Sequence, residues 1–177
     1  SKSAVIVGPD GLRRSLPYDR LVLAAGSQGF KPDIPGLAKY GFTVDQLDDA
    51  IALDHHLNAL ANRPSSAARN TAVVCGGGFT GIEVATEMPS RLRAILGPKA
   101  NVRVIIVDRN EAIAPAMGPH PRPLIEKALG EAGVETRLGV GVSALNESGV
   151  TLSDGQSIDS ATVIWAGGFR ASPLTAQ

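Results

Sequence analysis

Two hydrophobic patterns along the chain divide it into predicted strands and helices. Apolar runs rich in Val and Ile predict strands at 4–7, 71–75, 102–107, 134–138 and 162–166. Apolar residues at helical spacing predict helices over 44–62, from Ile82 to Ile95 and from Pro121 to Gly133. An unbroken apolar run such as 102–107 is typical of a strand inside a parallel sheet. The pattern therefore predicts an alternating α/β chain.

Local signals place the ends of these helices. Thr43 and Gln46 have the spacing of a capping box, which predicts a helix beginning near residue 44. Arg63-Pro64 should end that helix, because the residue before a proline is disfavoured in the helical conformation. Pro89 lies inside the second predicted helix and is expected to kink it.

One arrangement of turns and strands occurs twice. Asp154-Gly155 is a hairpin signal within a predicted antiparallel meander, and Asp10-Gly11 occupies the same place in an amino-terminal hairpin. Each hairpin is followed by an apolar run and a glycine, and the earlier run, Leu21–Ala25, is expected to be a buried strand. The echo predicts two homologous units, the first of them incomplete, although two hairpins can share this pattern by chance.

Composition narrows the possible functions. Hydrophobic residues make up 44% of the 177 positions, and Lys plus Arg equal Asp plus Glu at 17 each. This balance predicts a globular chain and gives no net field to attract nucleic acid. A single cysteine, Cys75, excludes a redox-active cysteine pair within this chain and fits a cytoplasmic setting. The chain has no apolar run long enough for a transmembrane segment.

The candidate chemistry lies in a glycine loop between a predicted strand and a predicted helix. Gly76, Gly78 and Gly81 form the pattern G-x-G-x-x-G, in the context that a dinucleotide requires. The first glycine permits a tight turn, the second lets the backbone approach a pyrophosphate, and the third lets helix and strand pack closely. The amides and dipole of the helix would then face the phosphates. A glycine-rich turn without a ligand is the structural alternative.

An acidic residue follows the next predicted strand. Asp108 could accept hydrogen bonds from both hydroxyls of an adenosine ribose, which favours NAD over NADP, or it could be a solvated turn residue. It stands farther from Gly76 than the usual spacing of about 20 positions, and the long intervening helix and loop account for the excess. Arg109 could accommodate a 2′-phosphate or stack on adenine.

A functional and a structural interpretation are both open for Glu83, Gly167 and Gly168, whereas Trp165 has only a structural one. Glu83, near the start of the helix, could face a nicotinamide or could stabilise the helix dipole. Gly167 and Gly168 could contact the dinucleotide through their backbone or could serve only as turn residues. Trp165 is expected in the core. The histidines lack the neighbours that a metal site would require, so no metal ligand is predicted.

These segments together resemble the pyridine nucleotide-disulfide oxidoreductase superfamily, and in particular members similar to type II NADH dehydrogenases. The resemblance rests on YDRLVLAAGS (18–27), IPGL (34–37), VVCGGGFTGIEVATEM (73–88), VRVIIVD (102–108) and VIWAGGFRASPL (163–174). It implies a Rossmann-like, three-layer FAD/NAD(P)-binding α/β fold with a central parallel sheet and a small antiparallel meander. The residues expected to contact NAD(H) are Gly76, Gly77, Gly78, Phe79, Thr80, Gly81, Glu83, Asp108, Arg109, Ala166 and Gly167.

The resemblance also implies a division of the chain. Residues 1–40 would be the trailing part of an incomplete FAD-binding domain and a linker, residues 41–170 the NAD(H)-binding domain, and residues 171–177 the return to the FAD domain. The flavin G-x-G-x-x-G and the carboxy-terminal Gly-Asp flavin motif are absent, and Ala24-Ala25-Gly26 replaces the usual A-T-G. The chain is therefore expected to be a fragment that binds no FAD and has no activity by itself.

The function expected of the full-length protein follows from the same resemblance. It would pass hydride from NADH to FAD and then electrons to a quinone or a similar acceptor, in the cytoplasm or at the inner face of the membrane. An NADH-dependent ferredoxin reductase is one alternative. A nucleotide-sensing module without enzymatic activity is another.

Overall fold

The computed structural model describes residues 2–176, which form two compact units. The smaller unit comprises Ser1–Ser27 and Ala171–Gln177, and the larger unit comprises Gln28–Arg170. Each unit is described by itself below. Every residue expected to contact the dinucleotide lies in the larger unit.

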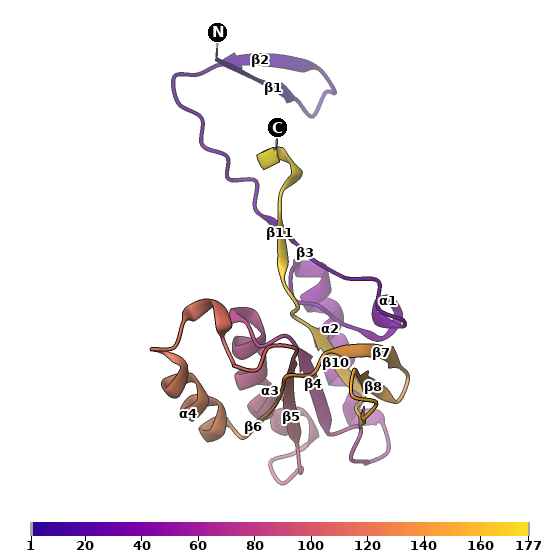
Figure 1. Ribbon diagram of the computed structural model, residues 1–177. Helices are drawn as coiled ribbons and strands as arrows, with labels where there is room; N and C mark the ends of the chain where they lie inside the picture. Colours follow the sequence, from indigo (N-terminus) through magenta and orange to yellow (C-terminus); the bar gives the residue numbers. More distant parts are fainter. Residues whose placement is uncertain (1, 177) are drawn as a thin grey trace. The chain divides into compact units, whose positions relative to one another are not determined.

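A four-stranded parallel sheet forms the centre of the larger unit (Figure 1). Its strand order is β10-β4-β5-β6, with bounds Thr162–Trp165, Thr71–Cys75, Arg103–Asp108 and Val134–Leu138. β4 and β5 are almost wholly buried, as their continuous apolar runs predict. The chain proceeds from β4 to β5 and β6 on one side, and then returns to place β10 on the other side of β4. This reversal creates a topological switch point between β4 and β10.

Helices cover one face of the sheet. They are α2 (Leu47–Ala59), the short 3-10 turn η1 (Leu60–Asn62), α3 (Phe79–Leu96) and α4 (Arg122–Ala132). Alternate residues of the strands point toward them, so that Val74, Ile106 and Ile164 join Leu57 and Leu92 in one core. α3 continues through Pro89. Gly133 ends α4 in the left-handed conformation (φ 74°), as its position predicts.

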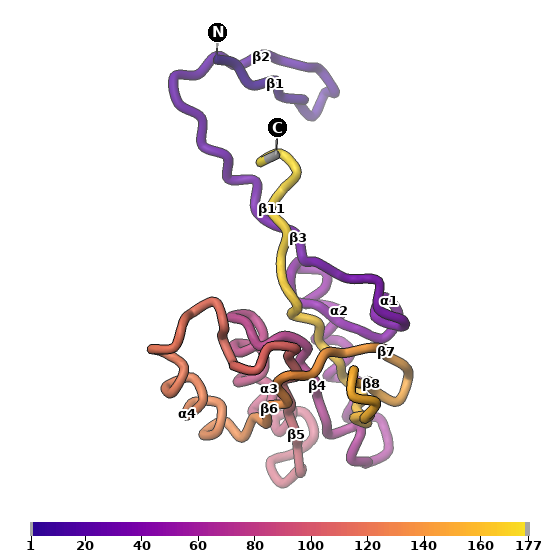
Figure 2. The backbone as a smooth tube through the Cα atoms, viewed as in Figure 1, coloured from indigo at the N-terminus to yellow at the C-terminus, as the bar shows by residue number. Residues whose placement is uncertain are grey.

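An antiparallel meander covers the other face of the sheet. Its strands are β7 (Val142–Asn146), β8 (Gly149–Leu152) and β9 (Ser157–Asp159), and a short helix, α1 (Leu37–Tyr40), packs beside it. The remaining alternate residues of the sheet, including Val73, Ile105 and Val163, form a second core with Leu145 and Leu152. Figure 2 follows the backbone from β6 through the meander into β10. The predicted fold class is confirmed.

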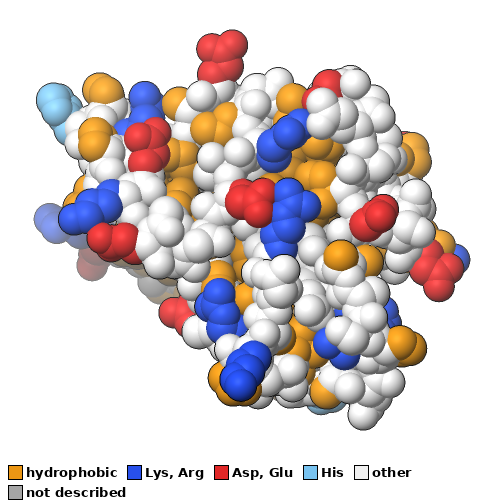
Figure 3. All heavy atoms as spheres, turned by 90° about the horizontal axis from the view of Figure 1, so that it is seen from below, with side chains coloured by type: hydrophobic (Ala, Val, Ile, Leu, Met, Phe, Trp, Pro, Cys, Tyr) orange, Lys and Arg blue, Asp and Glu red, His pale blue; other side chains and the backbone are white. Residues whose placement is uncertain are grey.

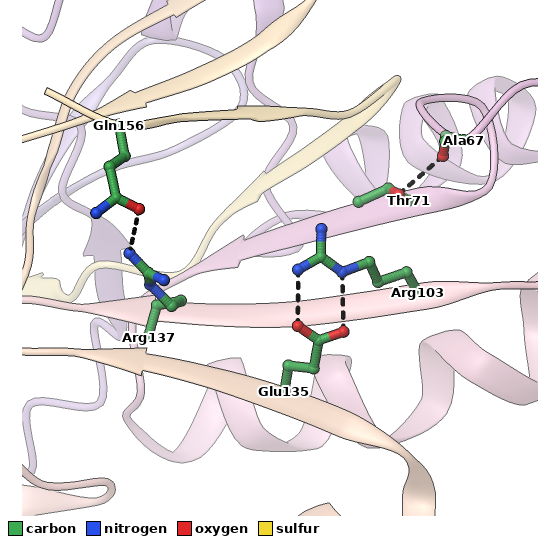
Figure 4. A network of polar contacts seen from close by, with 6 residues as sticks. All are labelled: Ala67, Thr71, Arg103, Glu135, Arg137 and Gln156. Carbon is green, nitrogen blue, oxygen red and sulfur yellow. Dashed lines mark hydrogen bonds and ion pairs between the residues drawn. The ribbon is translucent and has the colours of Figure 1, made fainter.

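An ion pair joins two neighbouring strands at the solvent edge of the sheet (Figure 4). Arg103 on β5 donates to both carboxylate oxygens of Glu135 on β6, at 2.8 and 2.7 Å. The hydrogen bond from Arg103 lowers the pKa of Glu135, and the same bond raises the pKa of Arg103. Both side chains are about half exposed, so the pair adds no more than about 1 kcal/mol to stability.

The smaller unit contains an antiparallel hairpin of β1 (Ser3–Val7) and β2 (Arg13–Pro17), together with the turn η3 (Pro173–Ala176). The hairpin confirms the amino-terminal strand and turn signals. The prediction of a buried strand at Leu21–Ala25 is wrong, because no described strand pairs with it and Val22 is 86% exposed. An apolar run becomes an inner strand only where other strands and side chains cover it.

Two short strands lie where the units meet along the chain. β3 (Ser27–Gly29) and β11 (Phe169–Ala171) pair with each other. The guanidinium of Arg170 stacks 3.9 Å from the centroid of the Phe30 ring. The amide of Phe30 donates to the carbonyl oxygen of Gly168 at 2.9 Å. The segment expected to be a linker is therefore partly ordered by pairing.

The start of α2 differs from the sequence prediction. The capping box at Thr43 is wrong: the helix begins at Leu47, and no side chain caps its N-terminus. The backbone of the preceding Phe42 pairs with β10, by accepting a hydrogen bond from Trp165 and donating one to Val163. This pairing carries Thr43 into the interior, where it is 2% exposed. Tertiary pairing has overridden a local helix signal.

Charged side chains on the face drawn in Figure 3 are scattered, with acidic and basic groups interspersed. No single-sign patch stands out on that face. Among residues 2–176, no helix has the length and apolarity required to cross a membrane.

Candidate functional site

The carboxyl ends of the four parallel strands border one cleft of about 440 Å³ in the larger unit. β4 contributes Gly76, β5 contributes Asp108, the segment after β6 contributes Gly141, and β10 contributes Ala166. Ligands of open α/β sheets bind outside the carboxyl ends of the strands at a switch point, which is where this cleft lies.

The glycine loop is held on both sides by the main chain. The amide of Gly76 donates to the carbonyl oxygen of Val107 at 2.8 Å, and the amide of Ala114 donates to the carbonyl oxygen of Gly77 at 2.9 Å. Ala114 has a φ of 49°, a strained conformation for a residue with a side chain. The loop after β5 therefore fixes the glycine loop at some cost in backbone strain.

Two of the loop glycines are required by close backbone contacts. Gly76 has a φ of 121°, and a Cβ atom there would lie 2.6 Å from the carbonyl oxygen of Ala166. A Cβ atom on Gly81 would lie 1.8 Å from the carbonyl oxygen of Gly76. The first contact sets the loop against β10, and the second sets the first turn of α3 against the loop. The positive φ of Gly76 fits the tight turn expected of the first glycine, and the contact at Gly81 fits the close packing expected of the third.

Gly78, in contrast, has no steric reason within the protein to be glycine. A Cβ atom there would meet nothing within 4 Å, and its φ of −81° is open to any residue. No side chain caps α3, and in the described part of the chain the amides of Gly78, Phe79, Thr80 and Gly81 have no hydrogen-bond acceptor. The loop thus presents free amides and open space, the arrangement that binds phosphate at a helix N-terminus.

Asp108 lies across from this loop at the end of β5. Its Oδ2 atom accepts a hydrogen bond from the amide of Gly77 at 2.5 Å. Its Oδ1 atom accepts two, from the backbone amide and the side-chain amide of Asn110, each at 2.7 Å. The side chain of Asp108 is partly buried, whereas the neighbouring Arg109 is exposed at the rim of the cleft. The structure therefore places a carboxylate in the same cleft as the open space at Gly78.

The end of β10 and the connector form the opposite wall. The indole nitrogen of Trp165 donates to the carbonyl oxygen of Phe30 at 2.9 Å. A Cβ atom on Gly167 would lie 2.4 Å from the Trp165 ring, so this glycine allows the chain to turn over the indole. Trp165 is half-buried and lines the cleft, so its expected place in the core is only partly correct. Phe30, Pro32 and Ile34 complete the wall.

The predicted contact residues differ in where they lie. The cleft is lined by Gly76, Gly78, Asp108, Arg109, Ala166 and Gly167. Gly77 and Gly81 lie behind the loop surface, and Phe79 and Thr80 form the first turn of α3. Glu83 lies apart from them: it is exposed and lines a different groove of about 750 Å³ between α2 and α3.

Cys75 is fully enclosed at the end of β4. Burial raises the pKa of its thiol to about 12, so the thiol is protonated and unreactive at neutral pH. Residues 2–176 contain no group of three or more side chains suited to hold a metal ion.

Sequence reasoning missed several residues of the cleft. Asn110 follows the end of β5, and the segment Val140–Val142 follows the end of β6. Their positions after predicted strands could have identified them. Phe30, Pro32 and Ile34 gave no such signal, because they precede the first strand of the parallel sheet in the chain.

Comparisons with known proteins identify relatives of this chain. The family model described as pyridine nucleotide-disulphide oxidoreductase matches residues 2–177. An NADH dehydrogenase-like protein of Mycobacterium tuberculosis is 50% identical over 165 residues, covering 92% of this chain and 41% of that protein. The type II NADH:quinone oxidoreductase NdhA of the same organism is 30% identical, covering 89% of this chain and 37% of that protein.

Solved structures share the fold. NDH2 from Plasmodium falciparum in complex with NADH has a TM-score of 0.75 at 17% identity, covering 98% of this chain and 39% of that one. The ferredoxin reductase for the CYP199A2 system of Rhodopseudomonas palustris has a TM-score of 0.70 at 20% identity, with 93% and 38% covered. The chain thus spans about two fifths of the length of the curated relatives it matches.

Proposed function

Because the chain belongs to the pyridine nucleotide-disulphide oxidoreductase family, we propose that it is the NADH-binding domain of an FAD-dependent NADH dehydrogenase-like oxidoreductase. Residues 41–170 would carry the dinucleotide site, and the flanking segments 1–40 and 171–177 would belong to the FAD domain and its connections. The observation that carries the proposal is that the free amides at the start of α3 and the carboxylate of Asp108 border the same cleft.

The residues present fit NAD(H). The free amides from Gly78 to Thr80 and the positive end of the α3 dipole would hold the pyrophosphate. The open space at Gly78 lets the phosphates approach the backbone. Ala166 and Gly167, at the end of β10, would contact the cofactor through their backbone. Glu83 would act only on a part of the cofactor that extends beyond the cleft toward the groove between α2 and α3.

The same geometry favours NADH over NADPH. Asp108 would accept hydrogen bonds from ribose hydroxyls, whereas its negative charge would repel a 2′-phosphate. Arg109, exposed at the rim, is free to stack on adenine. A basic pocket with no acid would be required for the opposite preference.

The redox reaction would belong to the full-length protein. FAD, when bound there, supplies the hydride-accepting chemistry, and a quinone or a similar acceptor would take the electrons in the cytoplasm or at the inner face of the membrane. The isolated chain is expected to bind NADH without FAD and without turnover. Acceptor assays on the full-length protein with a quinone and with a ferredoxin would separate a quinone reductase from a ferredoxin reductase.

Calorimetric titration of the chain with NADH and NADPH tests the binding proposal. Asp108→Asn keeps the shape of the side chain and removes its charge, so the Kd for NADH should rise about 5- to 100-fold and the preference for NADH should shrink. Asp48→Ala, on the exposed first turn of α2, is the matched control and should leave binding unchanged. Tighter binding of NADPH than of NADH by the unaltered chain would overturn the assignment.

A further inference from the structure

The carboxylate of Asp108 has few acceptor positions left for a ligand. An ionised carboxylate offers about four lone-pair positions on its two oxygens. Three donors already use them: the amide of Gly77 on Oδ2, and the backbone and side-chain amides of Asn110 on Oδ1. Both positions on Oδ1 are thus taken, and about one position remains on Oδ2.

An adenosine ribose presents two adjacent hydroxyl groups, and an acid at this place in the fold can bind both. With Asn110 as the structure shows it, Asp108 has room for only one of them. From this mismatch, and on the basis of the proposed function, we infer that Asn110 is a specificity-determining residue whose side-chain amide must leave Oδ1 to admit the second ribose hydroxyl.

The side-chain amide of Asn110 is dispensable for holding the carboxylate. The backbone amide of Asn110 forms a turn onto Oδ1, and the amide of Gly77 holds Oδ2, so two donors remain when the side chain moves away. Asn110 is exposed and lines the cleft, so its released amide can be hydrated at little cost. The side chain therefore competes with the ligand more than it positions Asp108.

Asn110→Ala tests this competition directly. Removing the side-chain donor leaves Oδ1 open to the hydroxyl, so the Kd for NADH should fall about threefold to tenfold. Asn58→Ala is the matched control, because the Asn58 amide also donates to a carboxylate, that of Asp54, but on α2 away from the cleft. The control should leave the Kd unchanged. In an Asp108→Asn background, Asn110→Ala should no longer tighten binding.

Dinucleotide analogues give a second measurement, made on both the unaltered chain and Asn110→Ala. For the unaltered chain, NADH lacking either the 2′- or the 3′-hydroxyl of the adenosine ribose should bind within about threefold of NADH, because Asn110 returns to Oδ1. In Asn110→Ala the same analogues should lose about tenfold. Equal losses in both proteins, or weaker NADH binding by Asn110→Ala, would overturn the inference.

Different results would contradict the proposed dinucleotide site and the proposed role of Asn110. If Asp108→Asn folds and binds NADH as the unaltered chain does, the proposed dinucleotide site itself is wrong. If Asp108→Asn weakens binding but Asn110→Ala does not tighten it, only the role of Asn110 is wrong.

Discussion

The amide of Gly77 donates to Oδ2 of Asp108 over 2.5 Å, which joins the loop after β4 to the end of β5. The two groups that would bind the phosphates and the ribose are therefore parts of one hydrogen-bonded unit. A substitution in the glycine loop should therefore affect Asp108, and a substitution of Asp108 should affect the loop. Three predictions follow from the contacts around this unit and the sheet below it.

Gly81→Ala should disrupt the fold. Its Cβ atom would lie 1.8 Å from the carbonyl oxygen of Gly76, and a backbone atom cannot yield as a flexible side chain can. We expect a loss of about 2–4 kcal/mol in the free energy of unfolding, measured by chemical denaturation. Gly130→Ala is the matched control, since a Cβ atom there meets nothing and alanine should stabilise the exposed helix α4 by about 0.5–1 kcal/mol. Similar effects at both positions would contradict the close contact.

Gly78→Ala should leave the stability of the fold nearly unchanged and weaken the binding of NADH. The added Cβ atom meets no protein atom, so the free energy of unfolding should change by less than about 0.5 kcal/mol. The same atom would enter the space proposed for the pyrophosphate, so the Kd for NADH should rise more than about tenfold. Denaturation and calorimetry on one preparation would measure both effects. Unchanged NADH binding would place the phosphates elsewhere.

His56 should make stability depend on pH. Its Nε2 atom lies 3.0 Å from the hydroxyl of Thr162, and its ring packs against Phe42 with centroids 4.4 Å apart. Burial, and then the charge of Arg63, lower the pKa of His56. The unfolded chain therefore binds a proton more readily, so the free energy of unfolding should decrease as the pH falls below about 6.5.

His56→Gln isolates this contribution, because glutamine can still reach Thr162 but does not titrate. Between about pH 7.5 and pH 5 the variant should lose less stability than the unaltered chain, by chemical denaturation at several pH values. An equal loss in both proteins would show that other groups account for the pH dependence.

The sequence was most informative where a segment's neighbours are nearby in the chain. β4, the glycine loop and α3 follow one another, so their apolar pattern and glycine spacing predicted both the elements and the close contacts of Gly76 and Gly81. The meander was equally local, because each turn connects strands that pair directly.

Segments that depend on distant partners could not be predicted from local patterns. Thr43 has a helix-capping signal, yet its position is determined by the neighbouring Phe42. Phe42 pairs with β10, which is more than a hundred residues away in sequence. Leu21–Ala25 is as apolar as β5, but no described strand covers it. Hydrophobicity alone does not indicate whether a covering surface exists.

The candidate site was predictable in its residue types but not in its hydrogen bonds. Asp108 was identified from its position after a strand, whereas the hydrogen bond from the Asn110 side chain to Oδ1 of Asp108 depends on a side-chain conformation that no sequence spacing encodes. Whether the predicted residues contact a dinucleotide stays a prediction.

The hydrogen bond from the Trp165 indole to the Phe30 carbonyl oxygen bears on how this module could be exchanged between relatives. A graft that began at residue 41 would omit Phe30, Pro32 and Ile34, and also the Pro35 carbonyl oxygen that accepts a hydrogen bond from Leu145. It would transfer the glycine loop and the acid but leave behind one side of the cleft. A chimaera that keeps an intact binding surface should therefore take its first splice junction upstream of residue 30.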